Sequence, residues 1–160
     1  MQITMLPNGM LQIDGAKITY RNFSGTPSQF NRSGDRNFAI IIPDQETADA
    51  LIDAGWNVKI KPAREEGDMP FMVLSVKVKF NERGPIAYLV TNGRKVRLDE
   101  ESIGVLDQVL VSSADLDIRP YDWSVNGNSG RSAYLHAICA TQVIEDRFAD
   151  DFCDVDSPSF

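Results

Sequence analysis

Apolar and polar residues alternate along much of the chain, and this pattern predicts short β-strands. In residues 71–80 the even positions from 74 to 78 are apolar, whereas Lys77 and Lys79 occupy odd positions. Successive side chains of a strand point to opposite faces, so these lysines should face away from the core. Further strands are expected at 17–23, 37–42, 56–61, 86–91, 94–98, 116–123 and 132–143.

Turn-forming residues separate these strands, and two short helices interrupt them. Asn92-Gly93 predicts a two-residue hairpin turn, and the sequence NGNSG at 126–130 predicts another. A helix is expected over 45–54, between Pro43-Asp44 and a closing glycine, and a second one after the acids at 99–101. The polar stretch 24–35 predicts a long mobile loop.

This order of elements predicts a mainly β protein. About seven to nine strands joined by short turns favour antiparallel pairing and closure into an OB-fold-like small antiparallel barrel with one or two short helices. A β-sandwich is the alternative. We expect the folded domain to span residues 1–146. Residues 147–160 are polar, acidic and unpatterned, which predicts a disordered acidic tail.

The composition is that of an ordinary globular protein. Of the 160 residues, 42% are hydrophobic and 24% charged, enough for one domain with its own core. No apolar run approaches the roughly 20 residues that cross a bilayer, and the N-terminus lacks a secretory pattern. We therefore expect a cytoplasmic protein, with Cys139 and Cys153 as thiols.

The net charge of −7 is unevenly distributed. From Glu145 onward the chain has six acids and one base, whereas the preceding residues have 17 acids and 15 bases. The acidity therefore belongs largely to the tail, and the nearly neutral body can carry a locally basic face.

Catalytic motifs are absent from the sequence. His136 is the only histidine, and no cysteine or glutamate lies at metal-ligand spacing from it. It is expected to be a half-buried strand residue. The sequence also has no glycine-rich phosphate loop and no nucleophile elbow. We therefore expect a protein without enzymatic activity, metal or cofactor, although a nuclease with dispersed carboxylates is a weaker alternative.

Cationic and aromatic residues are interleaved in several predicted strands. A site for single-stranded nucleic acid combines aromatic faces, on which bases stack, with cations that contact phosphates. Arg119, Tyr121 and Trp123 share one parity of their strand, whereas Trp56 and Phe38 are expected in the core. The candidate DNA-binding residues are Tyr20, Arg21, Phe23, Phe30, Arg32, Arg36, Lys59, Lys61, Lys77, Lys79, Arg119, Tyr121, Trp123, Arg131 and Tyr134.

The end of the chain resembles the acidic tip of bacterial and phage single-stranded DNA-binding proteins. The matching residues are Asp154, Asp156, Pro158 and Phe160, although Val155 breaks the run of acids. In that family the terminal phenylalanine ring and carboxylate dock in a basic-rimmed pocket of replication and repair enzymes. The resemblance therefore implies that this tail binds partner proteins.

The body resembles phage-encoded single-stranded DNA-binding proteins with an OB-fold. The resemblance runs from about Lys17 to Glu145 and is carried by the strings at 20–25, 31–38, 55–59 and 118–130. It implies sequence-tolerant binding of single-stranded DNA during phage replication or recombination, in the host cytoplasm, with replication or recombination proteins recruited by the tail. The rival hypothesis is a phage interaction module that modulates a host factor without binding DNA. The sequence leaves the oligomeric state open, a homo-oligomer included.

Overall fold

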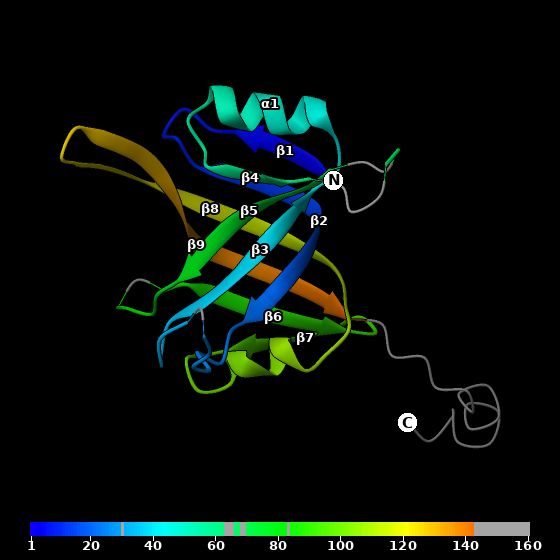
Figure 1. Ribbon diagram of the computed structural model, residues 1–160. Coiled ribbons are helices and arrows are strands. Elements are labelled where there is room, and N and C mark those ends of the chain that lie inside the picture. Colours follow the sequence, from blue (N-terminus) through cyan, green and yellow to red (C-terminus); the bar gives the residue numbers. More distant parts are fainter. Residues whose placement is uncertain (30, 63–65, 68–69, 83, 143–160) are drawn as a thin grey trace, which may run out of the picture.

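Nine strands and two short helices make up the part of the chain that the structure describes (Figure 1). The structure is a computed structural model, and it describes residues 1–29, 31–62, 66–67, 70–82 and 84–142. The elements are β1 (Gln2–Met5), β2 (Leu11–Asn22), β3 (Arg36–Ile42), α1 (Gln45–Asp53), β4 (Val58–Lys61), β5 (Phe71–Val78), β6 (Ile86–Thr91), β7 (Arg94–Leu98), the 3₁₀ helix η1 (Ile103–Asp107), β8 (Val111–Val125) and β9 (Asn128–Gln142).

Five of the strands close into a barrel. The sheet order is β4-β5-β3-β2-β8-β9-β6-β7, and an additional pairing of β5 with β9 joins the ring β5-β3-β2-β8-β9. The expected mainly β, OB-fold-like barrel is therefore confirmed. The short turns favoured antiparallel pairing, but β9 pairs in parallel with both β5 and β6, so the sheet is mixed.

The barrel encloses the hydrophobic core. Even-numbered residues of β5, such as Leu74 and Val76, point inward and are buried, as the alternation predicted. Trp56 and Phe38 are also buried, which confirms their expected place in the core. Phe23 stacks on Phe38 with ring centroids 5.0 Å apart.

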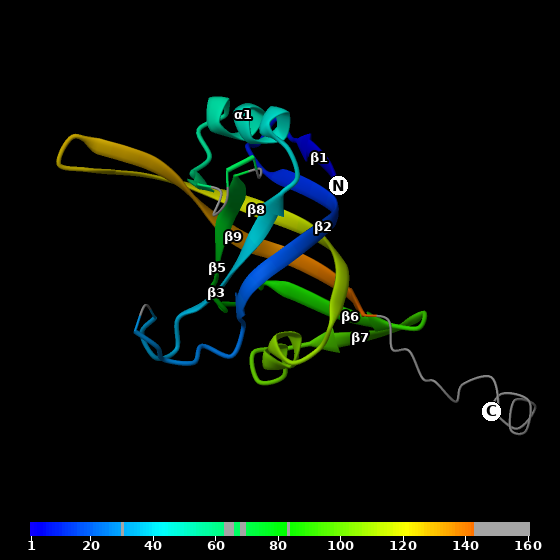
Figure 2. The same ribbon diagram turned by 45° about the vertical axis from the view of Figure 1, so that its right-hand side comes forward.

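The helices cover opposite ends of the barrel. Helix α1 begins where predicted, because the Asp44 carboxylate accepts a hydrogen bond from the Thr47 N–H at 2.7 Å and so caps the first turn. This hydrogen bonding, first to the side chain of Thr47, lowers the pKa of Asp44. The second expected helix is the short η1. Helix α1 lies near β1 and β4, whereas η1 lies near β6 and β7 (Figures 1 and 2). Neither described helix has the length and apolar character needed to span a membrane.

The β8–β9 hairpin extends well beyond the barrel as an arm (Figures 1 and 2). Its turn is only Asn126-Gly127, both with positive φ, and strand pairing continues to Val125 and Asn128. The sequence predicted a turn over 126–130, but Ser129 and Gly130 pair within the ladder. The predicted tail, 147–160, lies outside the described residues.

Candidate nucleic-acid interface

Side chains from three strands meet at Tyr134 on the outside of the barrel. Lys77 of β5 and Arg119 of β8 are both register partners of Tyr134 on β9. The Lys77 Nζ lies 5.8 Å from the centroid of the Tyr134 ring, and the Arg119 Cζ lies 5.7 Å from it. Both distances fall within the range of cation–π attraction. The structure therefore brings together three residues that the sequence had only placed on separate strands.

The arm continues this aromatic surface. Tyr121 contacts Tyr134 edge to face, with centroids 5.8 Å apart, and it is 57% exposed. Trp123, two positions further along the same face, is 39% exposed. Its ring lies over Gly130, where a Cβ atom would come within 2.7 Å of the Trp123 Cζ2. Glycine at this position therefore lets the indole lie against the strand with its other side open.

A second cluster lies around Tyr20, where β2 contains a bulge. The register of β2 against β3 shifts between Thr19 and Asn22, and Tyr20 has φ +48°. Few non-glycine residues adopt this conformation, and those that do are often functional. The Lys61 Nζ lies 4.5 Å from the Tyr20 ring centroid and donates to its hydroxyl oxygen at 3.2 Å.

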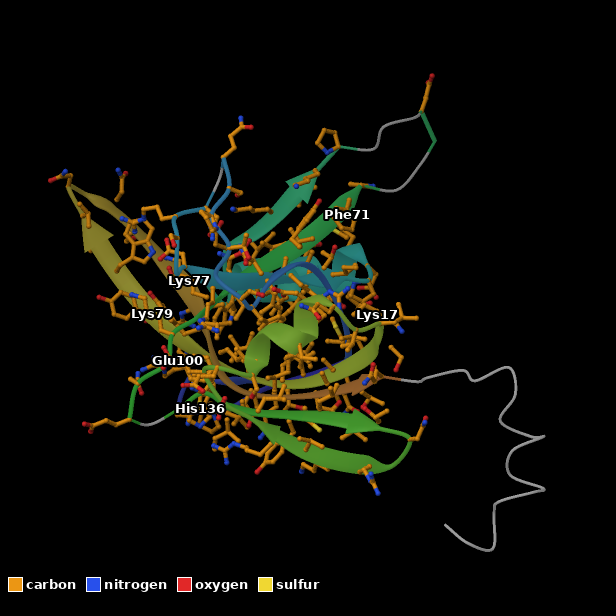
Figure 3. The ribbon with its side chains drawn as sticks, turned by 90° about the horizontal axis from the view of Figure 1, so that it is seen from below. Lys17, Phe71, Lys77, Lys79, Glu100 and His136 are labelled. Carbon is orange, nitrogen blue, oxygen red and sulfur yellow. The ribbon has the colours of Figure 1, made fainter. Side chains whose placement is uncertain are left out.

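Phe71 belongs to this second cluster, although the sequence analysis missed it. Its ring meets Tyr20 edge to face at 6.1 Å, and its register partner on β4 is Lys61. The signal was available, because Phe71 has the same odd parity on β5 as Lys77. Figure 3 shows Phe71 towards one end of β5 and Lys77 and Lys79 towards the other.

Both clusters lie on one outer surface, which we call the cationic face. Its two ends are separated by six residues of β5, or about 20 Å along the strand. Lys59 is exposed on β4 between them, opposite Val73. The cationic face comprises Tyr20, Lys59, Lys61, Phe71, Lys77, Lys79, Arg119, Tyr121, Trp123 and Tyr134.

Two cavities adjoin the Lys77 end of the cationic face. One, of about 380 Å³, is lined by four cations, Arg32, Arg36, Lys77 and Lys79, together with Asp35 and Glu100. The other, of about 200 Å³, is lined by Lys79, Arg119 and His136 among others. Both are suited to anions, since cations outnumber the carboxylates around them.

His136 is exposed rather than half-buried as expected. The β8–β9 register passes from Asp117 opposite Ala137 to Ile118 opposite Leu135, so His136 is the extra residue of a bulge. Its ring therefore lies outside the core, beside Lys79 and Arg119.

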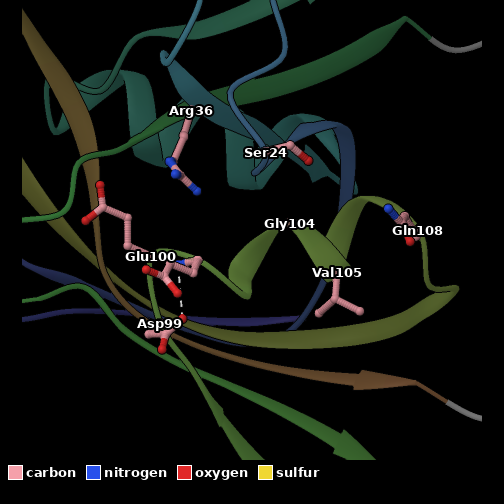
Figure 4. A pocket seen from close by; sticks show the side chains of 8 residues that line it. Ser24, Arg36, Asp99, Glu100, Gly104, Val105 and Gln108 are labelled. Atoms are coloured by element: carbon pink, nitrogen blue, oxygen red, sulfur yellow. Dashed lines mark hydrogen bonds between the residues drawn. The ribbon is translucent and has the colours of Figure 1, made fainter.

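A third hollow, larger than these two cavities, has the opposite charge. It has a volume of about 1110 Å³, and Asp99, Glu100 and Glu101 line it together with Arg36 (Figure 4). Asp99 also closes the turn before η1, and a hydrogen bond from the Ser102 hydroxyl is the main cause of its lowered pKa. Three carboxylates repel phosphate, so this hollow marks a boundary of the cationic face.

Phe23 and Arg21 were predicted to contact DNA, but the structure gives them internal positions. Phe23 is fully buried, so its ring cannot stack on a base; the bulge at Tyr20 turns it into the core. The Arg21 Nη1 donates to the carbonyls of Leu106 and Val109, the former at 2.8 Å. Arg21 therefore attaches β2 to η1, with its guanidinium directed away from the cationic face.

Arg131 also forms internal contacts instead of facing the cationic surface. Its guanidinium donates to Asp122 at 2.7 and 3.2 Å and to the Ala54 carbonyl at 3.0 Å, and it lies 5.4 Å from the Trp56 ring centroid. Hydrogen bonding to Arg131 lowers the pKa of Asp122, and the same contact raises the pKa of Arg131. This residue anchors the arm to the end of α1.

Hydrogen bonds connect the described residues of the loop at 24–35, which was predicted to be mobile. The Asn31 side-chain amide donates to the carbonyls of Thr26, Arg32 and Asp35, and the Gly34 N–H donates to the Gly25 carbonyl. Arg32 itself is exposed, with a salt bridge of 3.3 Å to Asp35.

Two sets of predicted site residues stay untested. Phe30 lies outside the described residues, as do the tail residues Asp154, Asp156, Pro158 and Phe160. The structure does describe Arg36, whose guanidinium already has internal partners. Its Nη1 donates to the Phe23 carbonyl at 2.7 Å, and its Cζ lies 5.4 Å from the Phe80 ring centroid.

Comparison with solved structures supports the fold. The single-stranded DNA-binding protein of bacteriophage Enc34 aligns with a TM-score of 0.56 at 10% identity, covering 94% of this chain and 93% of that chain. Its complex with ssDNA aligns with a TM-score of 0.56 at 12% identity, covering 89% and 92%. A C-terminally truncated form gives a TM-score of 0.54 at 11% identity, covering 89% and 91%.

Sequence comparison identifies the family. No curated protein matches the chain. The family profile of the phage ssDNA-binding domain, in contrast, matches residues 1–158, almost the whole chain. The chain therefore belongs to the phage ssDNA-binding domain family.

Proposed function

We propose that this protein binds single-stranded DNA along the cationic face, without strong sequence preference. The observation that carries the proposal is the convergence of Lys77 and Arg119 on the Tyr134 ring. Aromatic rings can stack on any base, while lysines and arginines bind the phosphates that every sequence shares. Family membership and the likeness to a protein solved in complex with ssDNA support the same function.

The geometry favours single strands over duplex DNA. The exposed rings of Tyr121, Trp123 and Tyr134 stack only on bases whose faces are free, and the bases of a duplex are already stacked on one another. A duplex would therefore make phosphate contacts alone.

A fluorescence titration tests this proposal. The protein has two tryptophans, of which Trp56 is buried and Trp123 is on the cationic face. Adding oligo-dT should quench the emission of Trp123, and the matched duplex should quench it far less. Trp123→Phe should remove the quenching while a fluorescein-labelled oligonucleotide still binds, and Trp56→Phe should retain it. Equal binding of duplex and single strand would contradict the proposal.

For the acidic tail we propose a separate task, the recruitment of replication or recombination proteins in the cytoplasm of the infected host cell. Its last residues, Asp154 to Phe160, combine carboxylates with a terminal aromatic ring. Acids steer the tail toward a basic surface, and the ring supplies an apolar anchor. Removing residues 145–160 should leave the affinity for oligo-dT equal or higher and abolish capture of the partners. A large loss of DNA affinity on truncation would contradict this division of roles.

A further inference from the structure

The β6–β7 hairpin carries a cation cluster that lies apart from the cationic face. Tyr88 of β6 is the register partner of Arg97 on β7, and its neighbours Ala87 and Leu89 are buried, so its ring points outward. The Lys95 Nζ lies 4.1 Å from the Tyr88 ring centroid, and the Arg97 Cζ lies 5.5 Å from it. This is the same combination of one tyrosine with one lysine and one arginine that occurs at Tyr134.

None of these cations is neutralised within the described part of the chain. The salt bridges there join Arg32 to Asp35 and Arg131 to Asp122, and neither involves β7. Lys95 and Arg97 are exposed on the same side of β7, and Arg94, the first residue of that strand, is exposed next to them. Like charges so close together repel one another, and a bound anion would relieve that repulsion.

Exposed cations on an outer strand can serve only to prevent aggregation, but the presence of Tyr88 argues against that explanation here. Lysines often blunt the edge of a sheet and so prevent aggregation. Preventing aggregation requires only exposed charged side chains, at any position along β7. The Tyr88 ring, however, attracts both cations and so limits the positions that their side chains adopt. Cations held in place lose less conformational entropy when they bind phosphate.

The cluster lies where a strand leaving the cationic face could reach it. Tyr88 pairs with Cys139 on β9, five residues beyond Tyr134, or about 17 Å along the strand. The cavity of Lys79, Arg119 and His136 lies beside the segment of β9 between these two positions. One OB-fold binds roughly 4–16 nucleotides, and a strand of that length spans both positions.

We propose that Lys95 and Arg97, positioned by Tyr88, form a second phosphate-binding subsite for the same single-stranded DNA. The proposal rests on the proposed function, which it extends from the cationic face to β7. Tyr88 is the positioning residue, and the two cations contact the DNA backbone.

Salt titrations of the full-length Lys95→Gln/Arg97→Gln variant test the proposal. On single strands each phosphate contact contributes about 0.7 to the slope of log K against log salt, so the slope on an oligo-dT of about 30 nucleotides should fall by about 1.4. The advantage of the wild type should then shrink about sevenfold between 50 and 200 mM salt. An oligo-dT of about 8 nucleotides, which the cationic face alone can hold, should bind both proteins equally.

The control variant is Gln12→Glu/Gln45→Glu, which reaches the same net charge of −9. Both glutamines are exposed, one at the start of β2, which pairs with neither β6 nor β7, and the other at the start of α1. Its slope should stay close to that of the wild type. If the two double variants behave alike, net charge explains the effect and the subsite does not exist.

The acidic tail is the other ligand that three cations could attract. The same β7 variant is therefore compared in a full-length background with Asp150, Asp151, Asp154 and Asp156 changed to Asn. If the change in slope persists there, the β7 cations contact DNA directly. If it disappears, they hold the tail and the proposal is overturned. An unchanged slope in the original background also overturns it, whereas failure of the wild type to bind any single strand removes the proposed function itself.

Discussion

Tyr134→Leu is the most informative single substitution on the cationic face. Leucine keeps an apolar side chain at a half-buried position but removes the ring on which a base would stack and against which Lys77 and Arg119 lie. Stacking on one aromatic side chain contributes about 1–3 kcal/mol. Because each 1.4 kcal/mol corresponds to a factor of ten, the Kd for oligo-dT should rise roughly 5- to 150-fold.

The salt dependence of binding distinguishes the contribution of the Tyr134 ring from that of the cations beside it. Tyr134→Leu removes no charge, so the slope of log K against log salt should stay within experimental error of the wild type. Lys77→Gln removes one phosphate contact and should reduce the slope by about 0.7, with a smaller loss of affinity at high salt. Tyr134→Phe, which retains the ring, is the matched control and should bind almost as the wild type does.

Fluorescence anisotropy of a labelled oligo-dT, recorded from low to high salt, measures both quantities. The melting temperature of each variant shows whether the barrel is intact. If Tyr134→Leu folds normally and binds as tightly as Tyr134→Phe, no base stacks on this ring. The central observation behind the cationic face would then have a purely structural meaning.

Three further predictions concern residues that support the surface. Gly130→Ala places a Cβ within 2.7 Å of the Trp123 ring, so the indole must move, and oligo-dT should bind more weakly at an unchanged melting temperature. Phe23→Ala should destabilise the fold by about 3–5 kcal/mol and lower the melting temperature by roughly 6–20 °C, measured by circular dichroism, because Phe23 is fully buried. The Asp122 pKa is lowered by Arg131, so the stabilising contact is present at neutral pH and is lost as the pH falls through that lowered pKa. Arg131→Gln should accordingly abolish this part of the acid dependence of unfolding while leaving the salt slope of DNA binding unchanged.

Sequence reasoning worked best where an element has one buried and one exposed face. The parity of residues 71–80 placed Lys77 and Lys79 outside and their neighbours inside, and burial confirms this. The turn at Asn92-Gly93 was equally predictable, because both residues adopt the positive φ that asparagine and glycine tolerate. These signals are local, and each depends on a few adjacent residues.

The arm and the bulges could not be predicted from local sequence patterns, and the cause is physical. Residues 128 and 129 point to opposite faces of the strand and are both exposed, so no hydrophobic alternation distinguishes them from a turn. The bulge at Tyr20 breaks the parity of β2, and as a result Tyr20 points outward while Phe23 returns to the core. The parallel pairing of β9 with β5 and β6 joins segments far apart in sequence, and no local pattern encodes it.

The different roles of lysines and arginines are the least predictable part of the site. They explain why some arginines that were predicted to contact DNA form internal contacts instead. Arg21, Arg36 and Arg131 each donate to backbone carbonyls, which a planar guanidinium with five N–H donors can do while making another contact. In a sequence these arginines look the same as Arg119, because only the position of a carbonyl acceptor distinguishes them. The lysines at positions 59, 61, 77 and 79, in contrast, are exposed on the outer surface. These three arginines hold the barrel, its arm and its loops together, so the proposed phosphate contacts fall mainly on lysines. Lysine bears a compact, strongly hydrated point charge that binds phosphate without demanding a fixed geometry, which suits a surface that must accept any sequence.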